Sequence, residues 1–166
     1  MEGQIGTFYP RRLQGDYGMF SYDAKNERIY ANMFMNREGR HWQQVDLLLF
    51  QKEVLFQFFP GNGTCVKFPL HTPFPSPLLP KNATFAGKVE LGTTSIPHAA
   101  LQINCWVAAQ EGASYTVMTS TDRGCLPQWW ATYDSEGWFS KSFFNITLGI
   151  IDPSVFTPPP QCLELL

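Results

Sequence analysis

Short runs of β-branched and aromatic residues recur along this chain, and turn-forming residues separate them. No apolar stripe at helical spacing persists over three turns, so the pattern predicts an all-β fold. The expected strands are 17–23, 28–35, 44–50, 54–59, 64–68, 84–91, 100–109, 115–121, 126–133 and 138–150. An antiparallel sheet of so many strands usually curls or pairs with a second sheet, so we expect an open sandwich or half-barrel.

The connections between these strands carry ordinary turn signals. A polar connector at 24–27 predicts a first hairpin, residues 51–53 join a second, and Gly61-Asn62-Gly63 turns the chain into the next strand. Five prolines between Pro69 and Pro80 remove backbone donors, which predicts an extended surface loop. A chain of 166 residues suits one domain, and we expect a single β domain over 1–166.

Two features indicate the secretory pathway. The triplets that begin at Asn62, Asn82 and Asn145 match the acceptor pattern for N-linked glycans. The four cysteines show no C-x-x-C spacing, and an even number of them suits two disulfides formed in an oxidising compartment. The start of the sequence lacks the regions of a signal peptide, so we expect that it represents the mature part of a secreted glycoprotein.

Charge and hydropathy exclude several classes of partner. The formal net charge is -2 without a cluster of Lys and Arg, which argues against nucleic-acid binding. No apolar run approaches the roughly 20 residues that cross a bilayer, so we do not expect a membrane-spanning protein.

The sequence contains no recognisable catalytic motif. The three histidines lack metal-site spacing, and the serines lack a Gly-x-Ser-x-Gly elbow. The carboxylates form no contiguous calcium loop, although separate loops could together supply a calcium site. We therefore expect a protein that is not an enzyme and requires no cofactor.

The aromatic content exceeds what an ordinary core of this size needs, since the chain has 14 Phe and 5 Trp. A glycan on Asn145 must face solvent, so alternation turns its neighbours in the last strand inward. Alternation groups further side chains on common faces, and Trp129 and Trp130 must face opposite ways. The candidate pocket residues are Val54, Phe56, Phe58, Ile103, Val107, Trp130, Phe144, Ile146 and Leu148. Filling the sandwich core is the alternative role for each of them.

A long segment near the end of the chain, residues 148–162, contains Asp-Pro-Ser-Val-Phe-Thr-Pro-Pro-Pro-Gln-Cys. It resembles the C-terminal signature of the ependymin-related proteins. Earlier parts of the chain also occur in the family's order, so the resemblance spans most of the chain. These parts are Phe20-Ser-Tyr-Asp23, the hairpin 46–59, Cys65 and Asn82-Ala-Thr-Phe85. Asp152-Pro153-Ser154 also reads as a turn that places Val155 and Phe156 against the sheet.

The resemblance implies a secreted or lysosomal glycoprotein. Its implied fold is two stacked, curved antiparallel sheets that enclose a deep hydrophobic pocket, similar to bacterial lipoprotein carriers. The implied cargo is lipids, fatty acids or other hydrophobic molecules. The family is also associated with calcium, with dimerisation and, in fish brain, with cell-matrix adhesion.

Four cysteines allow three pairings, and the residues themselves do not choose among them. The resemblance implies a Cys65–Cys162 bridge, which leaves Cys105 and Cys125 to pair across neighbouring strands. The family more often joins the position of Cys125 to an N-terminal cysteine that is absent from this sequence.

These observations together predict a protein that sequesters hydrophobic ligands in an apolar pocket between two sheets. An apolar wall discriminates a methylene weakly, so the expected selectivity is broad. The alternative is a calcium-associated extracellular-matrix or adhesion protein that acts through its surface, as a homodimer.

Overall fold

The computed structural model describes residues 1–12, 14–76, 79–109, 115–134 and 137–163. The chain is nearly all β, and its strands pair antiparallel, which confirms the predicted all-β class. The deep pocket between two stacked sheets and the likeness to bacterial lipoprotein carriers stay predictions. The strands are β1 (Glu2–Tyr9), β2 (Gln14–Asp23), β3 (Arg28–Arg37), β4 (Arg40–Leu49), β5 (Val54–Phe59), β6 (Thr64–Pro69), β7 (Thr84–Gly92), β8 (Ala100–Ala109), β9 (Tyr115–Thr121), β10 (Pro127–Asp134) and β11 (Gly137–Thr147). The helices are η1 (Pro10–Arg12), η2 (Phe50–Lys52), η3 (Pro153–Phe156) and α1 (Pro160–Leu163).

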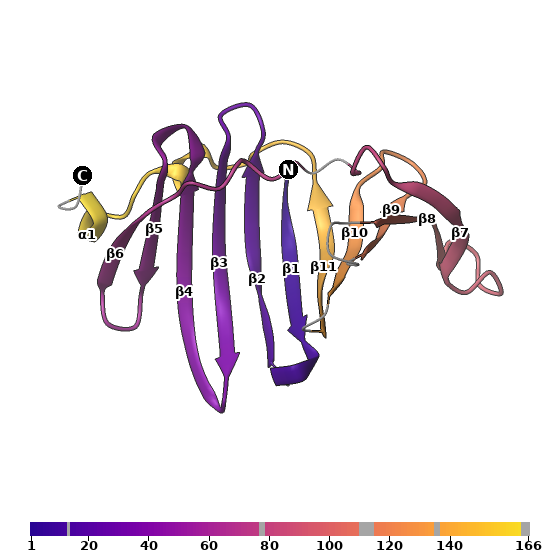
Figure 1. The fold of residues 1–166 in the computed structure, drawn as a ribbon, viewed down its shortest axis with the longest axis horizontal. Coiled ribbons are helices and arrows are strands. Elements are labelled where there is room, and N and C mark those ends of the chain that lie inside the picture. Colours follow the sequence, from indigo (N-terminus) through magenta and orange to yellow (C-terminus); the bar gives the residue numbers. More distant parts are fainter. Residues whose placement is uncertain (13, 77–78, 110–114, 135–136, 164–166) are drawn as a thin grey trace. The chain divides into compact units, whose positions relative to one another are not determined.

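The strands follow one another in a single hydrogen-bonded order, β6-β5-β4-β3-β2-β1-β11-β10-β9-β8-β7 (Figure 1). This order is open, with β6 and β7 at its edges. None of the helices in the described part of the chain is long and apolar enough to cross a membrane.

The chain divides into two compact units. Unit 1 comprises residues 1–6, 14–75 and 144–166, and unit 2 comprises residues 7–13 and 76–143. The single domain expected over 1–166 stays a prediction.

In unit 1, hydrogen bonds and backbone angles explain which residues occupy the hairpin turns. Between β2 and β3, the Asp23 carboxylate accepts hydrogen bonds from Asn26 Nδ2 at 2.7 Å and from Arg28 Nε at 2.8 Å. Between β3 and β4, Glu38 and Gly39 both have positive φ, as a tight two-residue turn requires. Arg37 pairs with Arg40 across this turn, so β4 begins four residues before the expected strand 44–50.

Strand β1 is the one strand that the sequence pattern missed. Its glycines weaken the β signal of the segment, but a glycine also permits close approach of another backbone. A Cβ added at Gly3 would lie 2.9 Å from the carbonyl oxygen of Phe144. This strand therefore forms because it pairs with other parts of the chain, and local β propensity does not include such pairing.

The core of unit 1 lies against the C-terminal segment. Leu47, Leu49, Val54 and Phe56, on one face of β4 and β5, form a buried cluster with Phe156 and Cys162. Asp152 Oδ1 accepts a hydrogen bond from the Ser154 backbone at 2.9 Å and thereby starts η3. The turn predicted at Asp152 thus delivers Phe156 to the sheet, and α1 lies beside β6 (Figure 1).

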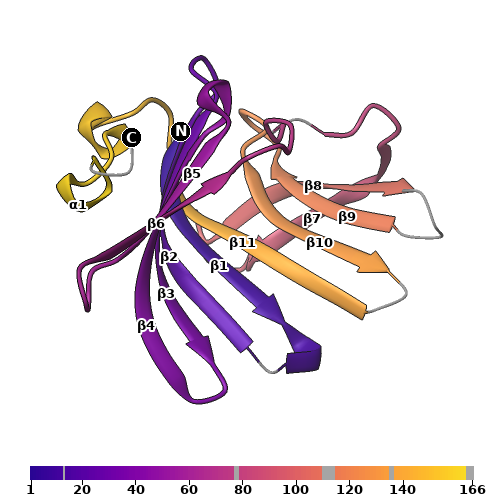
Figure 2. The same ribbon diagram turned by 60° about the vertical axis from the view of Figure 1, so that its left-hand side comes forward.

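Unit 2 has a much smaller buried core than unit 1. Its strands β7 to β10 and the first part of β11 lie side by side (Figure 2). Among the described residues of this unit, the buried apolar side chains are Ile103, Ala108 and Ala131. Its larger apolar side chains are therefore half-buried or exposed.

Candidate functional site

The predicted pocket residues on β5 belong to the core of unit 1. Val54 and Phe56 are buried, and Phe56 is only 1% exposed because Phe156 and Cys162 pack into the same cluster. Phe58 packs against this cluster from its edge. The alternative role, filling the core, is the one that these three side chains have in the structure.

The alternation expected around Asn145 is wrong. Asn145 has a φ of 48°, which interrupts the extended backbone, and β11 ends at Thr147. Phe144 is consequently 55% exposed, Ile146 is half-buried, and Leu148 lies beyond the strand with 79% exposure. Asn145 itself is exposed, as the glycan argument requires.

The three predicted pocket residues of unit 2 lie on opposite faces of its sheet. Trp130 pairs with Met118, which pairs with Trp106, so these side chains share one face. Ile103 and Val107 have the opposite parity in β8 and therefore lie on the other face. On this sheet Trp130 therefore does not share a face with Ile103 and Val107, and the role of these residues in a pocket stays a prediction.

The face of Trp130 carries the most suggestive arrangement in the described part of unit 2. A single register row crosses all five strands, and we call it the aromatic row. It consists of Lys141, Trp130, Met118, Trp106 and Phe85. The first four side chains are half-buried, whereas Phe85 at the edge strand is 48% exposed and lies edge-on to Trp106 at 5.2 Å.

Lys141 is the charged member of the row. Its Nζ lies 5.5 Å from the centre of the Trp130 ring and 6.0 Å from that of Phe139. No carboxylate among the described residues forms an ion pair with it. Burial lowers the pKa of Lys141 because the apolar surroundings solvate its charge poorly.

A second donor next to Lys141 also lacks a partner. Trp130 Nε1 is buried and makes no hydrogen bond within the described residues, whereas Trp106 Nε1 donates to Ser120 Oγ at 3.3 Å. A buried donor without an acceptor costs free energy. The row thus offers one cation and one N–H group beside a strip of half-buried apolar surface.

The sequence analysis missed Lys141, although a signal for it exists. Within the expected strand 138–150, Lys141 lies two residues from Phe139 and two from Phe143. Side chains two residues apart in a strand point to the same face, so the sequence already places Lys141 on an aromatic face. A single lysine on such a face indicates either a side chain that reaches back to water or a site for an anion.

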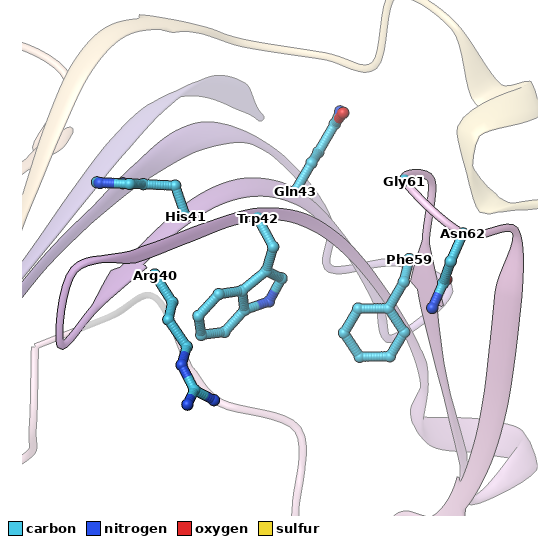
Figure 3. A pocket seen from close by; sticks show the side chains of 7 residues that line it. All are labelled: Arg40, His41, Trp42, Gln43, Phe59, Gly61 and Asn62. Carbon is cyan, nitrogen blue, oxygen red and sulfur yellow. The ribbon is translucent and has the colours of Figure 1, made fainter.

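An open hollow of about 530 Å³ lies in unit 1, where β4 begins and β5 ends. Its lining consists of Arg40, His41, Trp42, Gln43, Phe59, Gly61 and Asn62. Figure 3 shows the rings of Trp42 and Phe59 and the side chain of Asn62 on the same side of the ribbon, whereas Gln43 points away. None of the nine predicted pocket residues lines this hollow.

Another hollow of unit 1, of about 330 Å³, lies around residues 70–74. Glu27, Glu53 and His71 contribute to its lining. Among the described residues of the chain, no three His, Cys, Asp or Glu side chains are placed to hold a metal ion.

The cysteines divide into one bridge and two free thiols. Cys65 and Cys162 form the disulfide that the resemblance implied, with Cα atoms 5.3 Å apart. The Cys105–Cys125 bridge is not formed. Cys105 lies within β8 opposite Thr119, whereas Cys125 lies in the turn after β9 with a φ of 50°, so the register gives Cys105 a different neighbour.

The other face of the unit 2 sheet carries a ladder of stacked rings. Tyr115 stacks on Tyr133 at 4.6 Å, Tyr133 stacks on Trp138 at 5.9 Å, and Phe8 meets Trp138 edge-on at 6.0 Å. Phe8, Tyr115 and Trp138 are each about two-fifths exposed, at 43%, 45% and 39%. We call these four residues the ring ladder.

The structure thus defines an all-β protein with an open antiparallel strand order. The Ependymin family model matches residues 39–162, and the chain belongs to this family. The mammalian ependymin-related protein 1 of Rattus norvegicus is 32% identical over 97% of this chain and 72% of its own length. The ependymin of Notemigonus crysoleucas is 27% identical over 87% of this chain and 68% of its own length.

A solved structure shares the fold. An uncharacterised conserved protein from Thermus thermophilus superposes with a TM-score of 0.63 over 96% of this chain and 85% of its own, at 9% identity. At this identity the likeness concerns the fold alone. The family membership suggests a secreted glycoprotein.

Proposed function

We propose that this protein is a non-enzymatic binder of amphiphiles, which holds an apolar tail along the aromatic row and an anionic head at Lys141. The observation that carries this proposal is an ammonium group without an ion-pair partner and a buried indole N–H without a hydrogen-bond partner among the described residues, both beside half-buried apolar surface. An anionic oxygen would satisfy both donors at once. The tail would cover Met118 and Trp106.

The expected affinity follows from burial of the tail. Each buried methylene contributes about 0.8 kcal/mol, so ten of them contribute about 8 kcal/mol, which corresponds to micromolar binding. Losing translational and rotational freedom opposes this gain. A charged hydrogen bond at Lys141 contributes about 1.5–3 kcal/mol and thereby favours anionic heads over neutral ones.

Three ligands with twelve-carbon chains test the proposal: dodecanoate, dodecanol and dodecyltrimethylammonium. We expect dodecanoate to bind most tightly and the cation most weakly, as measured by isothermal titration calorimetry below micelle formation. Equal affinity for all three ligands, or no binding of dodecanoate, would overturn the proposal.

Adjacent tryptophans provide a matched pair of variants for the same measurement. Trp130→Ala removes a member of the row, whereas Trp129→Ala removes the same side chain from the opposite face. We expect weaker dodecanoate binding in the first variant only. Equal losses in the two folded variants would place the ligand elsewhere.

The ring ladder supports a second candidate function, an extracellular-matrix or adhesion protein that acts through its surface. Exposed aromatic side chains are enriched at protein interfaces. Trp138→Ser would then abolish binding to immobilised matrix protein while leaving dodecanoate binding intact. Loss of dodecanoate binding alone would instead tie the ladder to the amphiphile site.

A further inference from the structure

The turn between β5 and β6 places a sequon at the rim of the 530 Å³ hollow. Phe59 pairs with Thr64, and the four residues between them form the turn. Gly63, with a φ of 68°, donates its backbone N–H to the Phe59 carbonyl at 2.9 Å. The turn therefore holds Asn62 in a fixed position between an aromatic residue and the sequon threonine.

The side chain of Asn62 is already oriented. Its Oδ1 accepts a hydrogen bond from the Thr64 backbone N–H at 3.0 Å. Within the described residues its Nδ2 makes no hydrogen bond, and Asn62 is exposed. The acceptor nitrogen of this sequon is therefore free to react.

The other two sequons differ in this respect. Asn82 Nδ2 donates to the Ala109 carbonyl at 2.7 Å, so modification would break a hydrogen bond. Asn145 lies within β11 with a left-handed backbone. Neither lines the 530 Å³ or the 330 Å³ hollow, whereas Asn62 lines the larger of these two.

The hollow is large enough for a small ligand such as a pyranose ring. Its volume of about 530 Å³ lies within the range of small-molecule sites. Figure 3 shows the Phe59 and Trp42 rings turned to the side on which Asn62 projects. The faces of aromatic rings are electronegative, and the axial C–H groups of a sugar ring are weakly positive, so the two surfaces attract each other.

We propose that Asn62 carries an N-linked glycan and that its first N-acetylglucosamine packs in this hollow against Phe59 and Trp42. The glycan comes from a lipid-linked diphosphate oligosaccharide. Asn62 Nδ2 loses a proton and bonds to the sugar C1, while the bond from C1 to the diphosphate oxygen breaks and the lipid diphosphate leaves. The hollow thus binds a sugar attached to the chain itself and is a different site from the amphiphile site on unit 2.

The experiment uses the full chain secreted from eukaryotic cells that make high-mannose glycans. Glycopeptide mass spectrometry measures occupancy at Asn62, and an endoglycosidase then trims each glycan to one N-acetylglucosamine. We expect the trimmed protein to melt about 2–4 °C above Asn62→Gln. The difference should vanish when both proteins also carry Phe59→Leu.

A matched control removes a different glycan. Thr147→Ala abolishes the Asn145 sequon, and its effect on melting should be the same with Phe59 as with Leu at that position. An unmodified Asn62 in the secreted protein would overturn the proposal. So would a stabilisation by the Asn62 sugar that persists in Phe59→Leu.

A second measurement does not depend on how Phe59→Leu folds. Nuclear Overhauser contacts between the ring protons of Phe59 and the sugar protons, with ring-current shifts of the latter, are expected in the trimmed wild-type protein. Sugar resonances at the positions of a free asparagine-linked sugar would contradict the packing.

Discussion

Lys141→Met separates the stability of the aromatic row from its binding function. Methionine replaces the apolar stem of lysine, one atom shorter than the whole side chain, and removes the charge that burial disfavours. We therefore expect the ligand-free variant to be more stable than wild type at pH 7, as measured by urea unfolding. The same variant should bind dodecanoate more weakly.

The size of the binding loss follows from the lost contact. A hydrogen bond to a charged group contributes about 1.5–3 kcal/mol, so dodecanoate affinity should fall about 10- to 150-fold. Dodecanol carries no charge for Lys141 to balance, and its affinity should change little. Calorimetry with both ligands separates the head contact from the tail contact.

The pH dependence supplies an independent check with a defined sign. The folded pKa of Lys141 lies below the unfolded value of about 10.4, so the unfolded state binds more protons between these two values. Wild-type stability should therefore gain from this group as pH rises through that interval. The advantage of Lys141→Met at pH 7 should shrink over the same interval.

Lys88→Met is the matched control. Lys88 lies on the same sheet but is exposed, and its Nζ is 2.7 Å from Asp122 Oδ1. Its replacement should leave dodecanoate affinity unchanged. If Lys141→Met binds dodecanoate like wild type, or is the less stable protein at pH 7, then Lys141 is satisfied in the fold and the anion site does not exist.

Three further predictions concern the fold of unit 1. A Cβ at Gly18 would collide with the backbone of β3, so Gly18→Ala should lower the free energy of unfolding by about 1–3 kcal/mol. A Cβ at Gly61 meets no atom within 4 Å, so the control variant Gly61→Ala should change this free energy little. Urea titration of the unglycosylated protein measures both effects. Cys162→Ser opens a loop with a sequence separation of 97 and should cost about 2–5 kcal/mol in the same assay, and an unchanged midpoint would contradict this. Burial raises the pKa of Asp23, but hydrogen bonds from its turn lower it more, so the stability it contributes above pH ~4 is lost as pH falls through its folded pKa. Asp23→Asn should flatten acid unfolding in that range, and an unaltered acid transition would remove Asp23 from the account.

Local signals predicted most of the strands because each depends on nearby residues. The bounds of β5, β8 and β9 agree with the expected ranges, since turn residues flank each of these runs. The start of β4 was missed because Glu38, an unusual residue for positive φ, forms the turn with Gly39. Strand β1 was missed because its glycines depend on close approach of a distant backbone.

The pocket residues were harder to predict, because alternation reports which side chains share a face but not what covers that face. Val54 and Phe56 did share a face, and the segment that covers them begins almost a hundred residues later, at Asp152. The segment that resembles the family signature thus covers the core of unit 1. Its aromatic residue, Phe156, fills the space where a ligand was expected.

The same reasoning explains why we place the proposed ligand on unit 2. Unit 1 uses its C-terminal segment to bury the apolar face of β4 and β5, whereas no comparable cluster of buried apolar residues occurs in the described part of unit 2. The fold gains less free energy from Trp106, Met118 and Trp130 while they are only half-buried. The buried charge of Lys141 beside them lowers the stability further. These costs on one face are the reason for which we propose a molecule that relieves them when it binds.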